Sequence, residues 1–265
     1  MERADQLVHW FDDFERCIVA FSGGVDSAVV AKAAAIRLGE LAVAITSQSP
    51  SVAKSELQIA EQVAKQIGIK HEVIATREVE NPAYRANDTQ RCYHCKTELY
   101  GTLNSIAEQR DIAIVVSGTN ADDLGDFRPG LKAAAEKGIR HPLVELGIGK
   151  DDVRALARHW ELVVAEKPAS PCLASRVAYG VEVTAERLMQ IEQAEAWMRQ
   201  HGFVEFRVRY HQDGIARIEV PLKELSKLTD NTLREPLVNH FRSLGFRRVS
   251  LDLEGFFSGS LYQLR

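Results

Sequence analysis

The first two thirds of the chain alternate short apolar runs with longer segments of helical periodicity. The apolar runs are rich in β-branched residues: CIVAF begins at Cys17, LAVAIT at Leu41, HEVIA at His71 and DIAIVVS at Asp111. Strands separated by helices predict parallel crossovers, and near-continuous apolar strands are typical of a sheet covered on both faces. We therefore predict a doubly wound, mostly parallel α/β sheet that binds ligands at the carboxyl ends of its strands.

The alternation ends in the segment KPASPCLASRVAY, whose prolines and small residues predict an ordered loop. We place a hinge at residues 168–180, between a large α/β domain at 1–167 and a smaller domain at 181–265. In the smaller domain, Thr184 is placed to cap a helix that runs to about His201. EFRVRY and IARIEV, joined by HQDG, alternate as half-exposed strands, and a helix and a last strand near RRVSLDL follow. This pattern predicts a small α+β domain.

Composition and charge narrow the class of protein. The chain has 265 residues, of which 45% are hydrophobic, and a net charge of −4. A protein that coats nucleic acid needs a dominant basic surface, so we expect no nucleic-acid partner. No apolar run has the length of a signal peptide or a membrane span, so we expect a cytoplasmic protein without membrane contact. Four cysteines are too few for a disulfide framework and are interpreted as thiols, metal ligands or core residues.

The segment SGGVDS lies directly between the first predicted strand and a helix. At a helix N-terminus, unpaired backbone N–H groups and the helix dipole favour an anion. Gly23 and Gly24 let the backbone approach phosphate oxygens, and the hydroxyls of Ser22 and Ser27 provide further donors. An ordinary Gly-Gly turn is the alternative. The motif lacks the spacing of a kinase P-loop and resembles the PP-loop of ATP pyrophosphatases. That resemblance implies cleavage of ATP to AMP and pyrophosphate, with Asp26 helping to hold Mg²⁺.

A second loop, SGTNADDLGDFRPG, follows the strand DIAIVV and is therefore expected at the same end of the sheet. It resembles the GT-x-N loop that NAD synthetases place near ATP. We expect this loop to complete the nucleotide site, with carboxylates that bind metal or water and an arginine that binds phosphate. The candidates are Gly118, Thr119, Asn120, Asp122, Asp123, Asp126 and Arg128. Taken singly, each charged residue also fits a solvated loop.

Three cysteines stand out for their chemistry. RCYHCK places Cys92 and Cys95 at the predicted start of a helix, where both sulfurs can face one ion and the positive end of the dipole favours thiolates. A zinc half-site or a redox pair fits the same spacing. Cys172 lies beside prolines and small residues in the hinge, which leaves its sulfur accessible and placed like a nucleophile. Cys17 falls inside the first strand and is interpreted as a core residue.

Four segments in this order, SGGVDS, RCYHCKTEL, SGTNADDLGDFRPG and KPASPCLASRVAYG, resemble the LarE family of ATP-dependent sulfur transferases, and FRVRYHQDGIARIEV is similar to its C-terminal signature. The resemblance covers nearly the whole chain. It implies a homo-oligomer in the pathway to the nickel-pincer nucleotide of lactate racemase, acting on pyridinium-3,5-biscarboxylic acid mononucleotide. ATP would adenylate each carboxylate, which gives AMP as a good leaving group, and sulfur would then replace it.

Two arginines on one side of a predicted strand are candidates for the substrate. Arg207 and Arg209 are two residues apart, so their side chains share one face and can hold the phosphate or the carboxylates of the substrate. A solvated strand face fits the same pattern.

The resemblance implies two possible sulfur sources. In family members with only the SPCLASR cysteine, that side chain gives up its sulfur and becomes dehydroalanine. Others carry three cysteines and hold a [4Fe-4S] cluster, whose iron without a protein ligand carries an extra sulfide. Cys92, Cys95 and Cys172 match the second pattern, and three thiolates with an open fourth position suit a cluster that exchanges a ligand. We therefore expect the cluster, with Cys172 as sacrificial donor the alternative.

Other functions fit parts of the sequence. A tRNA thiolase shares the PP-loop but would bind tRNA with steep salt dependence, which the acidic charge balance does not favour. An ammonia-dependent ligase of the NAD or GMP synthetase kind would have no use for Cys172. A non-catalytic ATP-binding sensor would need neither reactive thiols nor pyrophosphate release.

Overall fold

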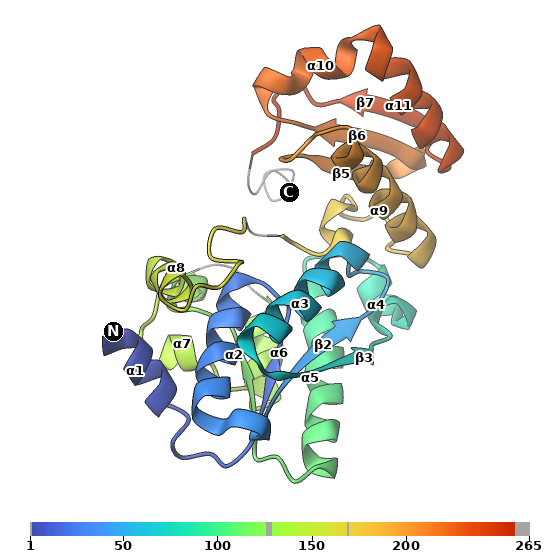
Figure 1. Cartoon of the computed structure of the whole chain (residues 1–265). Helices are drawn as coiled ribbons and strands as arrows, with labels where there is room; N and C mark the ends of the chain where they lie inside the picture. The colour runs from blue at the N-terminus through green and yellow to red at the C-terminus, as the bar shows by residue number, and fades with distance from the viewer. Residues whose placement is uncertain (1, 126–128, 169, 258–265) are drawn as a thin grey trace. The chain divides into compact units, whose positions relative to one another are not determined.

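The computed structural model divides into two compact units, both drawn in Figure 1. The first unit comprises Met1–Glu78 and Gln90–Ser170, and the second comprises Val79–Thr89 and Pro171–Arg265. The boundary near Ser170 falls inside the predicted hinge. The structure describes residues 2–125, 129–168 and 170–257.

The first unit is built on a parallel four-stranded sheet, as the sequence predicts. The strand order is β3-β2-β1-β4, and every neighbouring pair is parallel. Next to β4, the backbone of Arg140 exchanges hydrogen bonds with Val115 and Ser117 and extends the sheet edge. The strands are β1 (Cys17–Ala20), β2 (Ala42–Gln48), β3 (Lys70–Ala75) and β4 (Ile114–Ser117).

Helices cover both faces of this sheet (Figure 1). Val19 of β1 joins an apolar cluster with the helices on one face, whereas its neighbour Ile18 joins a cluster with the helices on the other. Burial from both sides explains why the strands read as unbroken apolar runs. The helices of this unit are α1 (Glu2–His9), α2 (Val25–Leu38), α3 (Lys54–Ile67), α5 (Arg91–Gln109), α6 (Pro129–Glu136), α7 (Pro142–Glu145) and α8 (Lys150–His159).

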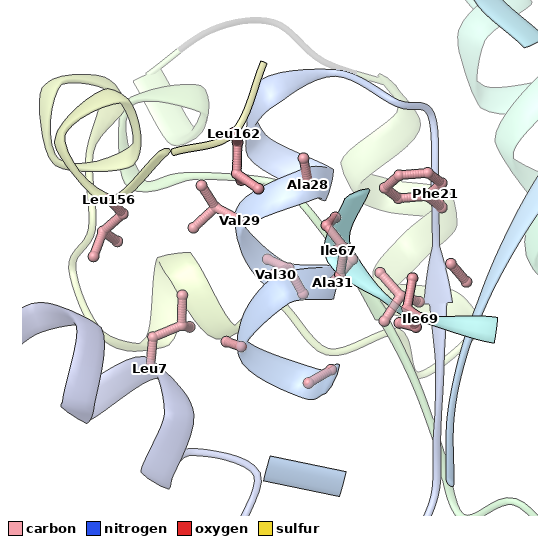
Figure 2. Packing of buried hydrophobic residues seen from close by; sticks show 14 of the residues in the cluster. Leu7, Phe21, Ala28, Val29, Val30, Ala31, Ile67, Ile69, Leu156 and Leu162 are labelled. Carbon is pink, nitrogen blue, oxygen red and sulfur yellow. The ribbon is translucent and has the colours of Figure 1, made fainter. Parts of the chain in front are cut away.

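The helix α2, which follows the first strand, is the centre of the larger cluster. Figure 2 shows Leu7 of α1, Val29 and Val30 of α2 and Leu156 of α8 gathered around it. All four are at most 4% exposed, and burying an apolar side chain of this size stabilises the fold by about 1.5–3 kcal/mol. This packing fixes α2 against the sheet and thereby fixes the loop that joins β1 to α2.

The second unit holds a three-stranded mixed sheet of order β5-β6-β7, in which β5 and β6 are antiparallel and β6 and β7 are parallel. The predicted helix cap is confirmed, because the side chain of Thr184 accepts a hydrogen bond from the backbone of Arg187. The elements are α4 (Pro82–Arg85), α9 (Ala185–Gln200), β5 (Arg207–His211), β6 (Ile215–Glu219), α10 (Leu225–Thr229), α11 (Asn231–Ser243) and β7 (Arg248–Leu251). Among the described residues, no helix is long and apolar enough to span a membrane.

The segment Val79–Thr89 differs from the sequence-based boundary, which assigned it to residues 1–167. Its buried Asn87 uses the side-chain amide to donate hydrogen bonds to the carbonyl oxygens of Val177, Ala178 and Val181, at 2.8–3.3 Å. These bonds satisfy the backbone of the loop that follows Cys172, which explains why the segment belongs to the second unit.

Candidate functional site

The loop between β1 and α2 closes into a cradle of backbone and hydroxyl groups. The hydroxyl of Ser27 lies 3.2 Å from the backbone nitrogen of Ser22 and 3.1 Å from its hydroxyl, and it donates to the carbonyl of Gly24 at 3.1 Å. Gly23 has φ +71°, and a Cβ there would lie 2.7 Å from the Cα of Ala60, so no larger residue fits. The cradle is therefore preformed at the N-terminus of α2, where phosphate binding is favoured.

The second predicted loop lies directly against this cradle. Because β4 pairs with β1, the segments that leave the two strands are neighbours. The side-chain amide of Asn120 donates to the Oδ1 of Asp26 at 2.8 Å. A Cβ at Gly118 would lie 2.5 Å from the backbone nitrogen of Ser27, so at this point the backbones of the two loops are in direct contact. The structure thus brings together the residues that the sequence assigned to one nucleotide site, and Thr119 lies within the same loop.

The carboxylate of Asp26 lies in surroundings that disfavour its negative charge. Burial raises its pKa, the hydrogen bond from Asn120 lowers it, and the neighbouring carboxylate of Asp123 raises it again. Asp123 is itself 8% exposed and accepts a hydrogen bond from the backbone of Asn120 at 3.2 Å. The half-buried Asp26 and the buried Asp123 together fit a divalent cation, whose charge would offset both the burial and the repulsion.

Two further predicted residues of this loop have different outcomes. The Oδ2 of Asp122 accepts a hydrogen bond from the backbone nitrogen of Lys150 at 2.6 Å, so this carboxylate lies at the N-terminus of α8. A negative charge is favourable at that end of a helix, so Asp122 has a structural role there. Arg128, with Asp126, lies outside the described residues.

The sequence did not indicate the role of His141, which lies at the same end of the sheet. Its Nδ1 is 2.8 Å from the hydroxyl of Ser117, and that hydroxyl is 3.1 Å from the one of Thr119. Burial lowers the pKa of His141, which favours the neutral form of the ring. A single histidine forms no sequence motif, so the sequence did not point to His141. Only its contact with Ser117 in the structure shows that it lies beside the second loop.

The pair Cys92 and Cys95 lies in the first turn of α5, as the sequence predicts. Cys92 is exposed and Cys95 is half-buried, and residues three apart share one helix face. Among the residues that the structure describes, no three His, Cys, Asp or Glu side chains form a preassembled metal site. Cys17 is fully buried in β1, and burial raises its pKa to about 12, which agrees with a core role.

Cys172 belongs to the second unit, where it is exposed at the start of a single 3₁₀ turn, Leu173–Arg176. The buried Arg176 holds this turn, because its Nη1 donates to the carbonyl oxygens of Pro171 and Cys172. The other side of the guanidinium pairs with Glu195 of α9, at 3.0 and 3.3 Å. Both side chains of the pair are at most 5% exposed. The exposed thiol is thus carried by a rigid, backbone-anchored loop.

Arg209 supports the same loop from the sheet. It is 5% exposed and forms two hydrogen bonds, of 2.9 and 3.0 Å, with the fully buried Glu219 of β6. Its Nη1 also donates to the carbonyl oxygen of Ser175 at 2.9 Å. The sequence-based hypothesis gave Arg209 to the substrate, but the structure engages its guanidinium with protein groups on both sides.

Arg207 has a different environment from Arg209. It is half-buried, its Nη1 donates to the carbonyl of Phe206 at 2.7 Å, and its guanidinium lies 5.0 Å from the centre of the Phe256 ring. Burial, and then the positive charge of Arg176, lower the pKa of Arg207 to about 10. No carboxylate among the described residues forms a hydrogen bond with it. An anion bound beside Arg207 would remove the cost of this charge.

A parallel α/β sheet with a glycine-rich anion cradle after its first strand, and a second loop sealed against it, defines a PP-loop ATP-binding domain. The sequence model of the asparagine synthase family matches residues 12–129, which contain the cradle and most of the second loop. The chain is 37% identical over 257 residues to the pyridinium-3,5-bisthiocarboxylic acid mononucleotide synthase of Lactiplantibacillus plantarum, covering 96% of this chain and 92% of that relative. It belongs to the LarE family and is an ATP-dependent sulfur-transferring enzyme.

Two other relatives are similar over different lengths. An uncharacterized protein of Synechocystis is 44% identical over 98% of this chain and 96% of its own. A tRNA-specific 2-thiouridylase of Azorhizobium caulinodans is 32% identical, over 58% of this chain and 49% of the relative. The full-length likeness therefore includes the Cys172 loop and the second sheet.

Proposed function

We propose that this enzyme converts the two carboxylates of pyridinium-3,5-biscarboxylic acid mononucleotide into thiocarboxylates for the nickel-pincer nucleotide. In the first step a carboxylate oxygen attacks the α-phosphorus of ATP, and the bond to the β-phosphate oxygen breaks, which releases pyrophosphate. In the second step sulfur attacks the acyl carbon, and AMP leaves with the electron pair of the broken carbon–oxygen bond. The full-length similarity to a synthase of the bisthiocarboxylic product supports this substrate.

The first step of the proposal, adenylation, rests on the contact between the β1–α2 loop and the loop that follows β4, which we call the two ATP loops. Backbone N–H groups and the hydroxyls of Ser22 and Ser27 would bind the β and γ phosphates, which then leave together as pyrophosphate. Asp26, held by Asn120 at 2.8 Å, would bind the Mg²⁺ that neutralises the departing charge. This cradle cannot use the mechanism of a kinase P-loop, because no lysine follows its glycines at the required spacing.

The second step of the proposal, sulfur transfer, depends on Cys172. A thiol that must reach an acyl-adenylate needs exposure and a fixed position, and this one is exposed on a loop that Arg176 holds by its backbone. Arg207 of the same unit, which forms no hydrogen bond with a carboxylate of the described residues, would bind the phosphate or a carboxylate of the substrate.

For the sulfur source, we propose the three-cysteine arrangement. Cys92 and Cys95 present two thiols on one face at the start of α5, and Cys172 supplies a third, so three of four ligand positions of a [4Fe-4S] cluster are available. Such a cluster would supply an exchangeable sulfide at its open iron. The alternative uses only Cys172, whose sulfur attacks the acyl carbon. Loss of the Cα proton and cleavage of the Cβ–S bond then leave dehydroalanine on the chain.

Pyrophosphate release tests the substrate. The enzyme is mixed with ATP, Mg²⁺ and the pyridinium dicarboxylate mononucleotide, and both pyrophosphate and the mass of the organic product are measured. Substrate-dependent release with an oxygen-to-sulfur mass change supports the proposal. Release that depends on tRNA instead would favour a 2-thiouridylase activity, for which the partial similarity is the one supporting observation. Release that depends on ammonia would indicate a ligase.

Iron and acid-labile sulfide content decides the sulfur source. The protein is purified without oxygen, and its absorbance is compared with that of Cys92→Ala. Stoichiometric iron that is lost in the variant supports the cluster. Iron-free protein after reconstitution refutes it, and a loss of the mass of H₂S per chain after turnover would then identify Cys172 as the donor. We further propose that the enzyme is a cytoplasmic homo-oligomer without nucleic-acid or membrane partners. Light scattering tests its oligomeric state.

A further inference from the structure

The second unit contains a cavity that none of the proposed chemistry uses. Its volume is about 750 Å³, which lies in the range of small-molecule sites. It opens where the β5–β6 turn, the end of α11 and the start of β7 meet. The lining residues are Asp213, Ile215, Arg242, Phe246, Arg247 and Arg248.

Three arginines surround this cavity, and their guanidinium groups form no ion pair or hydrogen bond with another residue of the part of the chain that the structure describes. Arg209 and Arg217 of the same unit differ from these three, because both pair with Glu219. These three exposed cations outnumber Asp213, the one carboxylate among the lining residues, so the cavity carries a net positive charge that favours an anion. The concentration of charge therefore points to an anionic ligand.

The frame that carries these cations is ordered. The backbone nitrogen of Arg247 donates to the carbonyl of Gly214 at 2.8 Å, and a Cβ at Gly214 would lie 3.2 Å from the Cγ of Arg247. Phe246 is 2% exposed, and its ring centre lies 5.5 Å from that of Tyr210 and 5.7 Å from that of Phe241. Each side chain thus starts from a fixed backbone position, which reduces the entropy lost on binding.

We propose that this cavity binds a nucleoside di- or triphosphate, as a second nucleotide site in addition to the PP-loop. Three guanidinium groups match a chain of phosphates, which accept paired hydrogen bonds from arginine. The exposed Asp213 provides an acceptor for ribose hydroxyls, and the half-buried Ile215 provides an apolar contact for the base. An inorganic phosphate alone would leave most of the volume unfilled.

Counting bound nucleotide on the full-length chain tests the proposal. Equilibrium dialysis with a non-hydrolysable ATP analogue is expected to give two equivalents per wild-type chain. Arg247→Ala/Arg248→Ala should lose one equivalent or bind it about tenfold more weakly, while pyrophosphate release at saturating ATP stays unchanged. Arg242→Ala, from a different element, should weaken the same equivalent. The control Arg234→Ala/Lys223→Ala removes the same charge from exposed positions of this unit and should keep both equivalents.

Several outcomes would overturn the proposal. One equivalent on the wild-type chain means that the cavity does not bind nucleotide. Equal loss in the control variant means that net charge alone attracts the analogue. Full displacement of the second equivalent by inorganic phosphate at the same concentration means a simple anion site. Loss of both equivalents in an Asp26→Asn variant would mean that they belong to one site. Loss of the PP-loop equivalent alone would instead separate this site from the proposed catalytic one and support the proposal.

Discussion

Replacing Gly118 by alanine tests whether the two ATP loops work as one site. The new Cβ would lie 2.5 Å from the backbone nitrogen of Ser27 and 2.8 Å from the carbonyl carbon of Asp26. Ordinary contact begins at 3.4 Å, so the loops must separate by about 0.9 Å, the difference between 3.4 and 2.5 Å. Both contacts are backbone atoms at the start of α2, so no side-chain rotation can relieve the clash. The phosphate cradle itself must move.

The expected losses follow from this displacement. A misplacement of about 1 Å at a reacting centre costs on the order of 100-fold in rate, so we expect kcat for pyrophosphate release to fall by about that factor. Overpacking should also lower the free energy of unfolding by about 1–3 kcal/mol. For a chain of this size each kcal/mol corresponds to about 2–4 °C in Tm.

The assay compares Gly118→Ala with Gly101→Ala, which makes the same chemical change inside α5 where a Cβ meets nothing within 4 Å. That control should gain about 0.4–1 kcal/mol of stability and keep full activity. Pyrophosphate release is measured at saturating ATP and substrate, and Tm by calorimetry. If Gly118→Ala releases pyrophosphate as fast as the control, the two loops do not form one catalytic cradle and our reasoning is wrong.

Four other substitutions separate catalytic from structural roles. Asp26→Asn removes a carboxylate whose pKa is raised by burial, so the ligand-free protein should become more stable above that pKa. In urea titrations, this gain in stability should vanish as the pH falls below the pKa of Asp26. The variant should also lose Mg²⁺-dependent release of pyrophosphate. Arg176→Ala leaves the buried Glu195 with only the more distant Arg199, at 3.8 Å, and should cost about 3 kcal/mol in denaturant titrations. An unchanged midpoint would mean that the pair of Arg176 and Glu195 does not hold the loop. Arg209→Ala leaves Glu219 with Arg217 as a remaining partner and should therefore cost less, whereas Arg207→Ala should raise the substrate KM and leave the midpoint nearly unchanged.

The parallel sheet and the ATP site were accessible from the sequence because their signals are local. The apolar run at Cys17 and the motif that follows it specify a strand, a turn and a helix within one short segment. That Gly118 follows a later strand at the same sheet end then needs only the rule that parallel strands share their carboxyl edge. The contact between Asn120 and Asp26 is a consequence of β1 and β4 being neighbours.

Longer-range features could not be predicted. Arg207 and Arg209 look equivalent on one strand face, and only the register that places Glu219 within reach of Arg209 distinguishes them. The segment around Asn87 carries no periodic pattern, and its place in the second unit depends on carbonyl groups about ninety residues further along, with a separation of 90 to Val177. Such pairs are fixed by tertiary packing and not by spacing in the sequence.

The way in which the second unit holds Cys172 bears on how the thiol can be consumed. Arg176 donates to the carbonyl oxygens of Pro171 and Cys172, and none of its described hydrogen bonds involves the sulfur. The loop should therefore keep its shape whether the side chain is a thiol, an alanine or a dehydroalanine. We expect Cys172→Ala to change the free energy of unfolding by no more than about 0.5 kcal/mol, as for an exposed residue, while thiocarboxylate formation is abolished. A large loss of stability in Cys172→Ala would mean that the sulfur itself holds the loop, and a scaffold that collapses when its sulfur leaves could not serve as a sacrificial donor.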